Sequence, residues 1–270
     1  MIKLVAIDLD GTLLNSQKEL STENKEMIRK VKEAGVKVVL CTGRPLKAVL
    51  HLLDALNLRE AGDFAVTYNG GLVQRTDSGE TLHQVTMTKD DAQDIYHMTQ
   101  QLNLPCNFID LDKIYEPPYP EGRPSLYPHQ MKFLETEPID MNGLPDELTI
   151  NKIVVHTETE ILDEAIPDIP ASFYERFSVM KSHPYMLEFM HKEADKGKGL
   201  KQLTKLLEIE PHEVMALGDE ENDLQMIQFA GTGVAMGNAS DKIKDEAQFV
   251  TKAADEHGVA YALKKFVLEK

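Results

Sequence analysis

Two aspartates, Asp8 and Asp10, directly follow a short apolar run near the N-terminus, in the stretch Asp8-Leu9-Asp10-Gly11-Thr12-Leu13-Leu14. Two carboxylates in one tight turn repel each other unless they share a proton or a cation. A turn that only reverses the chain has no need of two acids beside a Gly-Thr pair. The spacing therefore favours a chemical role, in which one or both carboxylates exchange a proton, attack a substrate or bind a cation.

A second acidic group lies in the C-terminal third, in the stretch Gly218-Asp219-Glu220-Glu221-Asn222-Asp223. Four acids and one amide within five positions form a set of oxygen ligands, which select Mg²⁺ over zinc or copper. The longer spacing of an EF-hand loop is absent. The alternative interpretation is the start of a helix, where acidic side chains interact favourably with the helix dipole.

Two further stretches carry groups that could bind an anion. Thr42-Gly43-Arg44 follows an apolar run, and its hydroxyl, backbone amide and guanidinium can all donate to an oxyanion. Asp195-Lys196-Gly197-Lys198-Gly199 precedes a helical pattern and could bind phosphate. It is not a P-loop, because the pattern G-x-x-x-x-G-K-[ST] does not occur. Taken alone, each stretch is equally typical of a polar loop.

The elements that position these residues alternate between strand and helix at both ends of the chain. We expect strands over 2–7, 36–41, 64–67, 214–218, 233–236 and 249–250, and helices over 22–34, 45–56, 199–207, 222–230, 241–247 and 258–267. This alternation indicates an α/β fold with a Rossmann-like, doubly wound parallel sheet. Such folds place ligand-contacting groups at the carboxyl ends of their strands.

The middle of the chain has a different pattern. A hairpin is expected around Asp77-Ser78-Gly79, a helix over 88–102, strands over 149–156 and 186–190, and a helix over 159–166. Seven prolines crowd the stretch 117–145, which predicts irregular loops between short antiparallel strands. We therefore predict that residues 83–185 form an inserted α+β domain, and that residues 1–82 and 186–270 form the core.

Composition excludes several classes of protein. The 270 residues include 29 basic and 45 acidic side chains, for a net charge of −16, and 42% are apolar. The chain is too apolar for a disordered protein and too acidic for a nucleic-acid binder. No apolar run approaches the roughly 20 residues of a membrane span. The two cysteines, Cys41 and Cys106, are expected to be free and buried, and the protein to be cytoplasmic.

Taken in order, the four stretches resemble the four motifs of the haloacid dehalogenase-like (HAD) phosphohydrolases. That pattern is D-x-D-G-T, a Thr at a strand end, a Lys before a helix, and G-D-x-x-N-D. The long insert between the second and third motifs is similar to the Cof-type, C2-cap subfamily, as is the turn Thr67-Tyr68-Asn69-Gly70-Gly71. The likeness covers nearly the whole chain and is greatest to the bacterial sugar phosphatases of that subfamily.

The resemblance implies a HAD core with an inserted C2-type cap domain that sets substrate specificity. It implies that Asp8 is a nucleophile that becomes an aspartyl phosphate, and that Asp10 is the general acid and then the general base. Thr42 and Lys196 would bind the phosphoryl oxygens. The implied ligands of Mg²⁺ are Asp8, the backbone carbonyl of Asp10, Asp219, Asn222 and Asp223.

The expected function is thus a Mg²⁺-dependent phosphoric monoester hydrolase that acts on small phosphorylated metabolites, in particular sugar phosphates. Gly43, Arg44 and Asn69 are candidate substrate residues. Cap residues such as His156 and Tyr119 are more typical of packing. Two alternatives stay open: a phosphomutase on the same scaffold, and a non-catalytic metabolite-binding protein. The sequence does not fix the physiological substrate or the oligomeric state, and a homodimer stays open.

Overall fold

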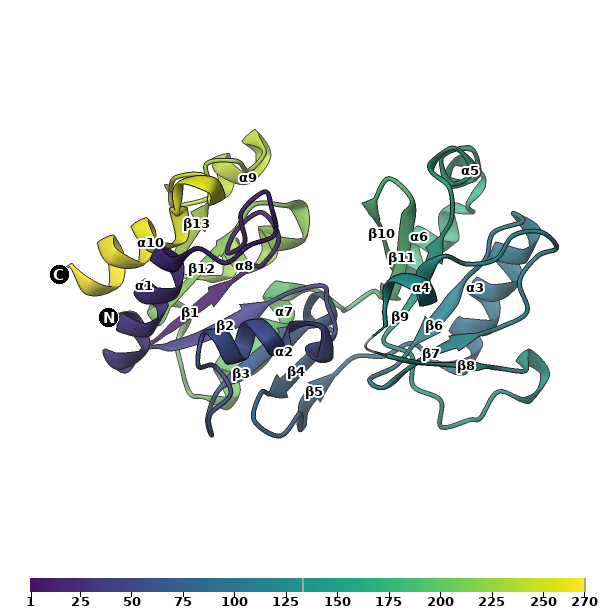
Figure 1. Ribbon diagram of the computed structural model, residues 1–270, viewed down its shortest axis with the longest axis horizontal. Helices are drawn as coiled ribbons and strands as arrows, with labels where there is room; N and C mark the ends of the chain where they lie inside the picture. The colour runs from purple at the N-terminus through teal and green to yellow at the C-terminus, as the bar shows by residue number, and fades with distance from the viewer. Residues whose placement is uncertain (133, 270) are drawn as a thin grey trace. The chain divides into compact units, whose positions relative to one another are not determined.

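The computed structural model describes residues 1–132 and 134–269 and divides the chain into two compact units (Figure 1). The first unit contains Met1–Gln84 and Asp195–Lys270, and the second contains Val85–Ala194. The predicted ranges include positions 133 and 270, which lie outside the described residues. One unit is inserted into the sequence of the other.

An eight-stranded sheet forms the centre of the first unit. Its strand order is β14-β13-β12-β1-β2-β3-β4-β5. Neighbouring strands from β14 to β3 are parallel, whereas β4 and β5 form an antiparallel hairpin at one edge. The strands are β1 (Leu4–Ile7), β2 (Lys37–Cys41), β3 (Phe64–Thr67), β4 (Leu72–Arg75), β5 (Thr81–Gln84), β12 (Val214–Gly218), β13 (Thr232–Ala235) and β14 (Phe249–Val250).

Helices cover both faces of this sheet, so its central strands are apolar on both sides. Val5 and Ile7 of β1 pack in one core cluster with apolar residues of α1, α2 and α10. Leu4 and Ala6 pack in a second cluster with residues of α7 and α8. The helices are α1 (Thr22–Glu33), α2 (Leu46–Ala55), α7 (Lys196–Leu206), α8 (Leu224–Phe229), α9 (Asp241–Glu246) and α10 (Gly258–Leu263). The predicted doubly wound α/β core is confirmed.

The second unit is built on a six-stranded sheet in the order β10-β11-β9-β6-β7-β8. Its strands are β6 (Asn107–Ile109), β7 (Lys113–Glu116), β8 (Glu135–Pro138), β9 (Lys152–His156), β10 (Phe177–His183) and β11 (Met186–His191). Its helices are α3 (Lys89–Gln101), α4 (Tyr127–Gln130), α5 (Thr159–Ala165) and α6 (Ala171–Arg176). The predicted α+β insert is confirmed. One pair differs from expectation, because β7 and β8 are parallel.

The observed boundaries between the units differ from the predicted ones. Strand β5 pairs with β4, so the hairpin belongs whole to the first unit, which continues to Gln84. Strand β11 pairs with β9 and β10, so residues 186–194 belong to the second unit and not to the core. In sequence an apolar strand such as 186–191 looks the same in either sheet, and only its pairing partners decide where it belongs.

Two smaller expectations can be compared with the structure. Cys41 and Cys106 are free and buried, as predicted. Among the described residues, no helix combines the length and the apolar character needed to cross a membrane.

Candidate active site

Three buried carboxylates gather at the carboxyl ends of the two central strands of the first unit. Asp8 follows β1 directly and Asp219 follows β12, and these two strands are parallel neighbours. Asp223 lies one turn beyond Asp219. Each of the three offers an oxygen atom, and these oxygens all lie within 4.8 Å of one another. The first and fourth sequence motifs therefore meet in space, as the parallel sheet predicts.

The turn after β12 aims the Asp223 side chain back at the strand end. Its Oδ2 atom accepts hydrogen bonds from the backbone amides of Asp219 (2.9 Å) and Glu220 (3.1 Å). These bonds leave Oδ1 to accept a hydrogen bond from the Lys196 ammonium. Asp223 is fully buried, and these two backbone bonds fix the orientation of its side chain.

Asp219 is held by two residues to which the sequence analysis gave no role. The Thr12 hydroxyl donates to Asp219 Oδ1 (2.7 Å), and Asn238 donates to the Gly11 carbonyl oxygen (2.8 Å) and to Asp219 Oδ2 (3.3 Å). Gly11 has a φ of +85°, and a Cβ there would lie 2.2 Å from Asp219 Oδ2, so only glycine fits. Asn238 could have been recognised as a candidate site residue from the sequence, because it follows the predicted strand that forms β13.

Lys196, which is 188 positions from Asp8 in the sequence, also belongs to this group. Its ammonium nitrogen lies 2.6 Å from Asp8 Oδ1 and 2.6 Å from Asp223 Oδ1. It is the first residue of α7, whose N-cap Asp195 accepts a hydrogen bond from the Lys198 amide. Burial alone would lower the pKa of Lys196, but the two carboxylates outweigh burial and raise it. Lys196 is therefore a permanent cation inside the acidic group.

The remaining negative charge fits a hard cation. Burial, followed by the charge of Asp223, raises the pKa of Asp8 to about 8, and burial raises that of Asp219 to about 6. A dication would relieve this repulsion, and three carboxylates are the oxygen ligands that Mg²⁺ prefers. On the chemistry of its donors, the group of Asp8, Asp219 and Asp223 fits a divalent metal ion.

Asp10 has different partners. Arg44 donates from Nε to Asp10 Oδ2 (2.9 Å) and from Nη2 to Oδ1 (2.6 Å), and Lys18 donates to Oδ1 (2.8 Å). Burial would raise the pKa of Asp10, but these hydrogen bonds and charges outweigh it and lower the pKa. Arg44, which was predicted from sequence as a candidate substrate residue, is paired with Asp10 in the structure, and its contact with substrate stays a prediction. The sequence analysis gave Lys18 no role.

The other candidate residues form a hydrogen-bonded group around the ends of β2 and β3. Thr42 is buried; its hydroxyl accepts from the Arg44 amide (3.1 Å) and its carbonyl accepts from the Asn69 amide (3.0 Å). Asn69 Oδ1 accepts from the Asn222 side chain (3.0 Å). A Cβ on Gly43 would lie 3.0 Å from that same Oδ1 atom. The structure thus places the Asn222 amide nitrogen against Asn69, beside the second motif.

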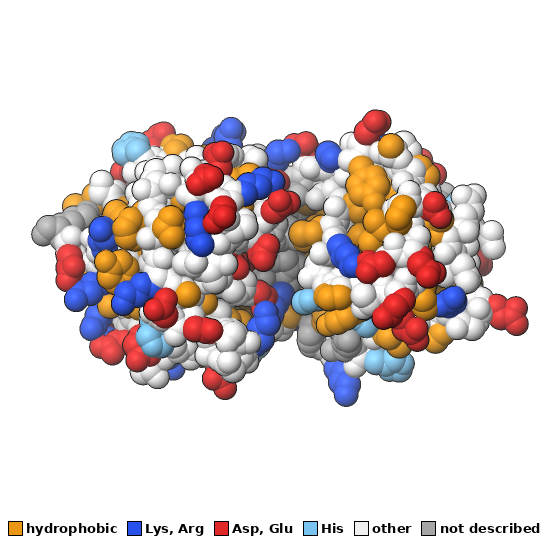
Figure 2. All heavy atoms as spheres, turned by 90° about the horizontal axis from the view of Figure 1, so that it is seen from above, with side chains coloured by type: hydrophobic (Ala, Val, Ile, Leu, Met, Phe, Trp, Pro, Cys, Tyr) orange, Lys and Arg blue, Asp and Glu red, His pale blue; other side chains and the backbone are white. Residues whose placement is uncertain are grey.

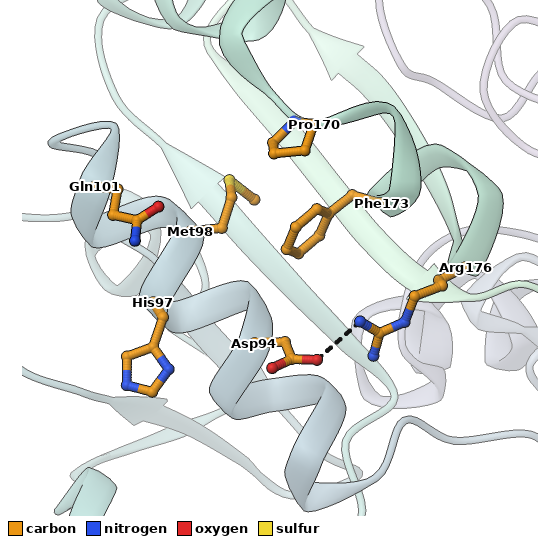
Figure 3. A pocket seen from close by; sticks show the side chains of 7 residues that line it. All are labelled: Asp94, His97, Met98, Gln101, Pro170, Phe173 and Arg176. Carbon is orange, nitrogen blue, oxygen red and sulfur yellow. Dashed lines mark hydrogen bonds and ion pairs between the residues drawn. The ribbon is translucent and has the colours of Figure 1, made fainter.

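A pocket of about 280 Å³ lies on the second unit, between α3 and α6 (Figure 3). An ion pair between Arg176 and Asp94 (2.8 Å) crosses it, and Met98 and Phe173 point toward each other inside it (Figure 3). Its lining residues are Asp94, His97, Met98, Gln101, Pro170, Phe173 and Arg176. None of the predicted site residues lines this pocket.

Comparison with known proteins identifies the class to which this chain belongs. The chain belongs to the haloacid dehalogenase-like hydrolase family, whose sequence model matches residues 5–263. The family predicted from the four motifs is confirmed.

Individual relatives align over the full chain. YxeH of Bacillus subtilis, which carries a provisional phosphatase name, is 39% identical over 270 residues and 100% of both chains. YcsE of the same organism, named a 5-amino-6-(5-phospho-D-ribitylamino)uracil phosphatase, is 33% identical over 99% of this chain and 96% of its own. A crystal structure of a haloacid dehalogenase-like hydrolase from Bacteroides thetaiotaomicron superposes with a TM-score of 0.83 at 30% identity, covering 98% of this chain and 99% of that one.

Proposed function

We propose that this protein is a Mg²⁺-dependent phosphatase that hydrolyses small phosphorylated metabolites, in particular sugar phosphates, through an aspartyl phosphate on Asp8. One observation carries the proposal. The buried Asp8 carboxylate has one oxygen on the Lys196 ammonium and lies within a group of three carboxylates suited to a divalent cation. A nucleophile, a fixed cation and a metal site therefore share one small volume.

Each group has a part in the two displacements. Asp8, Asp219, Asp223 and the backbone carbonyl of Asp10 would hold the metal ion, which supplies positive charge against the phosphate dianion. An Asp8 oxygen bonds to phosphorus while the ester P–O bond breaks, and Asp10 gives a proton to the leaving alcohol. Water then attacks phosphorus, its proton passes to Asp10, and the Asp8–phosphorus bond breaks.

The remaining residues hold the phosphoryl group and its ester. Lys196 would neutralise the equatorial phosphoryl oxygens, and the Thr42 hydroxyl would donate a hydrogen bond to them. These oxygens carry the negative charge in the transition state of phosphoryl transfer. We propose that Asn222, together with Asp223, is one of the residues that hold the metal ion. Gly43 and Asn69, which adjoin Thr42 and Asn222, are the proposed substrate contacts.

The substrate class is supported by two lines of argument. The motif pattern is similar to that of sugar phosphatases, and the relative YcsE is named for a phosphate ester on a ribityl chain. Both substrates are monoesters on a small polyhydroxylated chain. Selection among such esters is the role we propose for the second unit, Val85–Ala194.

Phosphate release from the full-length protein tests this proposal. Purified protein is incubated with p-nitrophenyl phosphate and with a panel of sugar phosphates that includes a phosphoribityl ester, with Mg²⁺ or with EDTA. We expect inorganic phosphate from several sugar phosphates with Mg²⁺ and almost none with EDTA. Full activity in EDTA would contradict the metal requirement.

The same assay separates the alternatives. Conversion of a sugar 1-phosphate to the 6-phosphate without net phosphate release would favour a phosphomutase. Binding of a phosphorylated ligand with no turnover of any ester would favour a non-catalytic sensor.

A further inference from the structure

We propose that Lys18 and Arg44 are positioning residues that hold the Asp10 carboxylate in one orientation for proton transfer. The inference rests on the proposed function, in which Asp10 gives a proton to the leaving alcohol and takes one from water. Neither Lys18 nor Arg44 is argued to touch the reacting atoms, because each acts through Asp10.

The contact geometry fixes the plane of the carboxylate. Arg44 donates to both Asp10 oxygens, at 2.9 and 2.6 Å, and Lys18 adds a third bond of 2.8 Å to Oδ1. A two-point bond from a planar guanidinium sets the orientation of a carboxylate, which a single point charge does not. The three bonds together determine where the Asp10 oxygens lie.

The backbone around Lys18 is built to hold that side chain in place. Asn15 Oδ1 accepts hydrogen bonds from the amides of Gln17 (3.0 Å) and Glu19 (2.8 Å), and the Asn15 carbonyl accepts from the Lys18 amide (2.9 Å). The loop is also attached at Ser16, whose amide donates to Asp255 (2.7 Å). Lys18 therefore projects from a closed, tethered loop.

Lys18 also has a backbone conformation that favours other residues. Its φ of +63° is in the left-handed region, where glycine or asparagine costs less free energy than lysine. Such a conformation persists where the surrounding structure determines it. The side chain at this position, an ammonium aimed at Asp10, is a reason for lysine to be there.

Arg44 is held from the other side of Asp10. Its amide donates to the Thr42 hydroxyl (3.1 Å), and its carbonyl accepts from the Tyr68 amide (3.4 Å). The guanidinium thus starts from a backbone fixed at the ends of β2 and β3. Two independent loops converge on one carboxylate.

The group is only partly buried. The side chains of Asp10, Arg44 and Lys18 are 36%, 34% and 58% exposed, respectively. Most ion pairs with that much exposure add little to folding, although bidentate pairs and charge networks can add more. Orientation of a proton-transferring carboxylate is a use that does not need burial, and misplacing such a group by about 1 Å can slow a reaction by roughly 100-fold.

The test compares two esters that differ in their need for a proton. Phenyl phosphate has a basic leaving group that needs protonation, whereas p-nitrophenolate leaves without it. Release of the phenol is measured in a single turnover, with enzyme in excess and Mg²⁺ present, for wild type, Lys18→Met, Arg44→Gln, Asp10→Asn and the control Lys30→Met. Lys30 pairs with Glu26 on the exposed face of α1 and lies outside the site.

Removing either cation also raises the pKa of Asp10 and favours its protonated form, so a slower release of phenol can come only from lost orientation. We expect Lys18→Met and Arg44→Gln to slow phenol release from phenyl phosphate by about 10- to 100-fold, with much less effect on p-nitrophenyl phosphate. The enzyme concentration that gives half of the maximal single-turnover rate stays close to that of wild type. Asp10→Asn should show a larger loss on phenyl phosphate, again with less effect on p-nitrophenyl phosphate. Lys30→Met should behave as wild type. Circular dichroism confirms that each variant is folded.

Three results would overturn the inference. An equal loss on both esters, or no loss on either, would show that the two cations do not act through Asp10. A rise in the half-saturating enzyme concentration with an unchanged maximal rate would make them substrate contacts. If wild type turns over neither ester, the proposed function fails and this inference fails with it.

Discussion

At the scale of single residues, Asp8 and Asp10 are two positions apart and have opposite electrostatic surroundings. Asp8 is buried among other acids, and its pKa is raised to about 8 by burial and by Asp223. Asp10 is partly exposed, and the hydrogen bonds of Lys18 and Arg44 hold its pKa below the ordinary value despite burial. The single cation Lys196 therefore does not hold the Asp8 pKa at its ordinary value, whereas the two cations at Asp10 hold that pKa below it.

Asp219→Asn tests the metal group directly. The change removes one charged ligand, so we expect the Mg²⁺ concentration for half-maximal activity to rise by about 10- to 100-fold. The rise in melting temperature on adding Mg²⁺ should shrink in parallel, because a ligand that binds only the folded state stabilises it by mass action. Both are measured by titrating Mg²⁺.

The matched control for this change is Glu221→Gln. Glu221 is exposed, pairs with Lys242 and lies outside the group of three carboxylates. It should leave both titrations unchanged. If the two variants need the same Mg²⁺ concentration as wild type, Asp219 does not bind the metal.

At the scale of elements, the start of α7 depends on a close approach by the turn after β3. A Cβ on Gly70 would lie 1.9 Å from the Asp195 carbonyl oxygen, and the Gly70 φ is +88°. Asp195 caps α7, and the next residue is Lys196. Gly70 therefore sets how closely the helix that carries Lys196 can pack.

We expect Gly70→Ala to lower the free energy of unfolding by about 2–4 kcal/mol, because it adds a steric clash to an unfavourable φ. Gly35→Ala is the matched control, since Gly35 has a φ of +82° and nothing within 4 Å of its added Cβ. It should cost about 1 kcal/mol. Urea denaturation measures both, and equal losses would show that the contact with Asp195 is unimportant.

The second unit contains a buried ion pair between neighbouring strands. Lys152 of β9 lies 2.7 Å from Glu188 of β11, and their side chains are only 5% and 6% exposed. Lys152→Met leaves the Glu188 charge buried without a partner, so we expect a loss of about 3–5 kcal/mol in the free energy of unfolding.

Two further variants complete this prediction. The double change Lys152→Met with Glu188→Leu removes both charges and should be clearly less destabilising than Lys152→Met alone. Lys113→Met breaks an exposed pair with Glu137 and should cost under about 1 kcal/mol. If the double variant is as unstable as Lys152→Met, the loss comes from removal of the ion pair and not from an unpaired buried charge on Glu188.

The elements of the first unit were predicted from the sequence, down to the two-residue strand β14, whereas several short elements of the second unit were missed. The continuous apolar run from Leu4 to Ile7 and the helical pattern of α3 were sufficient to place those segments. β6 spans only Asn107–Ile109, too few residues for a period to show. The parallel pairing of β8 with β7 is also invisible, because pairing partners depend on the whole sheet.

The candidate site divides in the same way. Asp8, Lys196, Asp219 and Asp223 were predicted from motif types at strand and helix ends, and the structure brings them together. The bond between Arg44 and Asp10 links positions 34 apart, and Lys18 lies in a polar loop with no periodic pattern. Contacts of this kind depend on loop geometry, which a local pattern does not encode.

At the scale of the whole molecule, the net charge of −16 is unevenly divided. The second unit, Val85–Ala194, has 8 basic and 20 acidic side chains and so carries −12, which leaves −4 for the first unit. Acidic side chains are spread over the visible face of both units (Figure 2). An anionic substrate therefore meets no attractive long-range field, and its binding depends on local cations.

We expect kcat/KM for a sugar phosphate to change less than about threefold, and upward, when ionic strength rises from about 0.02 to about 0.2 M, because salt screens repulsion between like charges. Mg²⁺ is held constant and saturating throughout. A steep fall in kcat/KM would reveal electrostatic steering that the charge distribution does not provide.

The central claim is that Asp8 carries the phosphoryl group, and trapping that group tests it most directly. The protein is mixed with p-nitrophenyl phosphate and Mg²⁺, quenched in acid within the first turnover, digested, and analysed by mass spectrometry. We predict one added phosphoryl group on the peptide that contains Asp8, none in Asp8→Asn, and a loss of turnover of at least about 10³-fold in that variant. A phosphoryl group on any other residue, or sustained turnover by folded Asp8→Asn, would contradict the account.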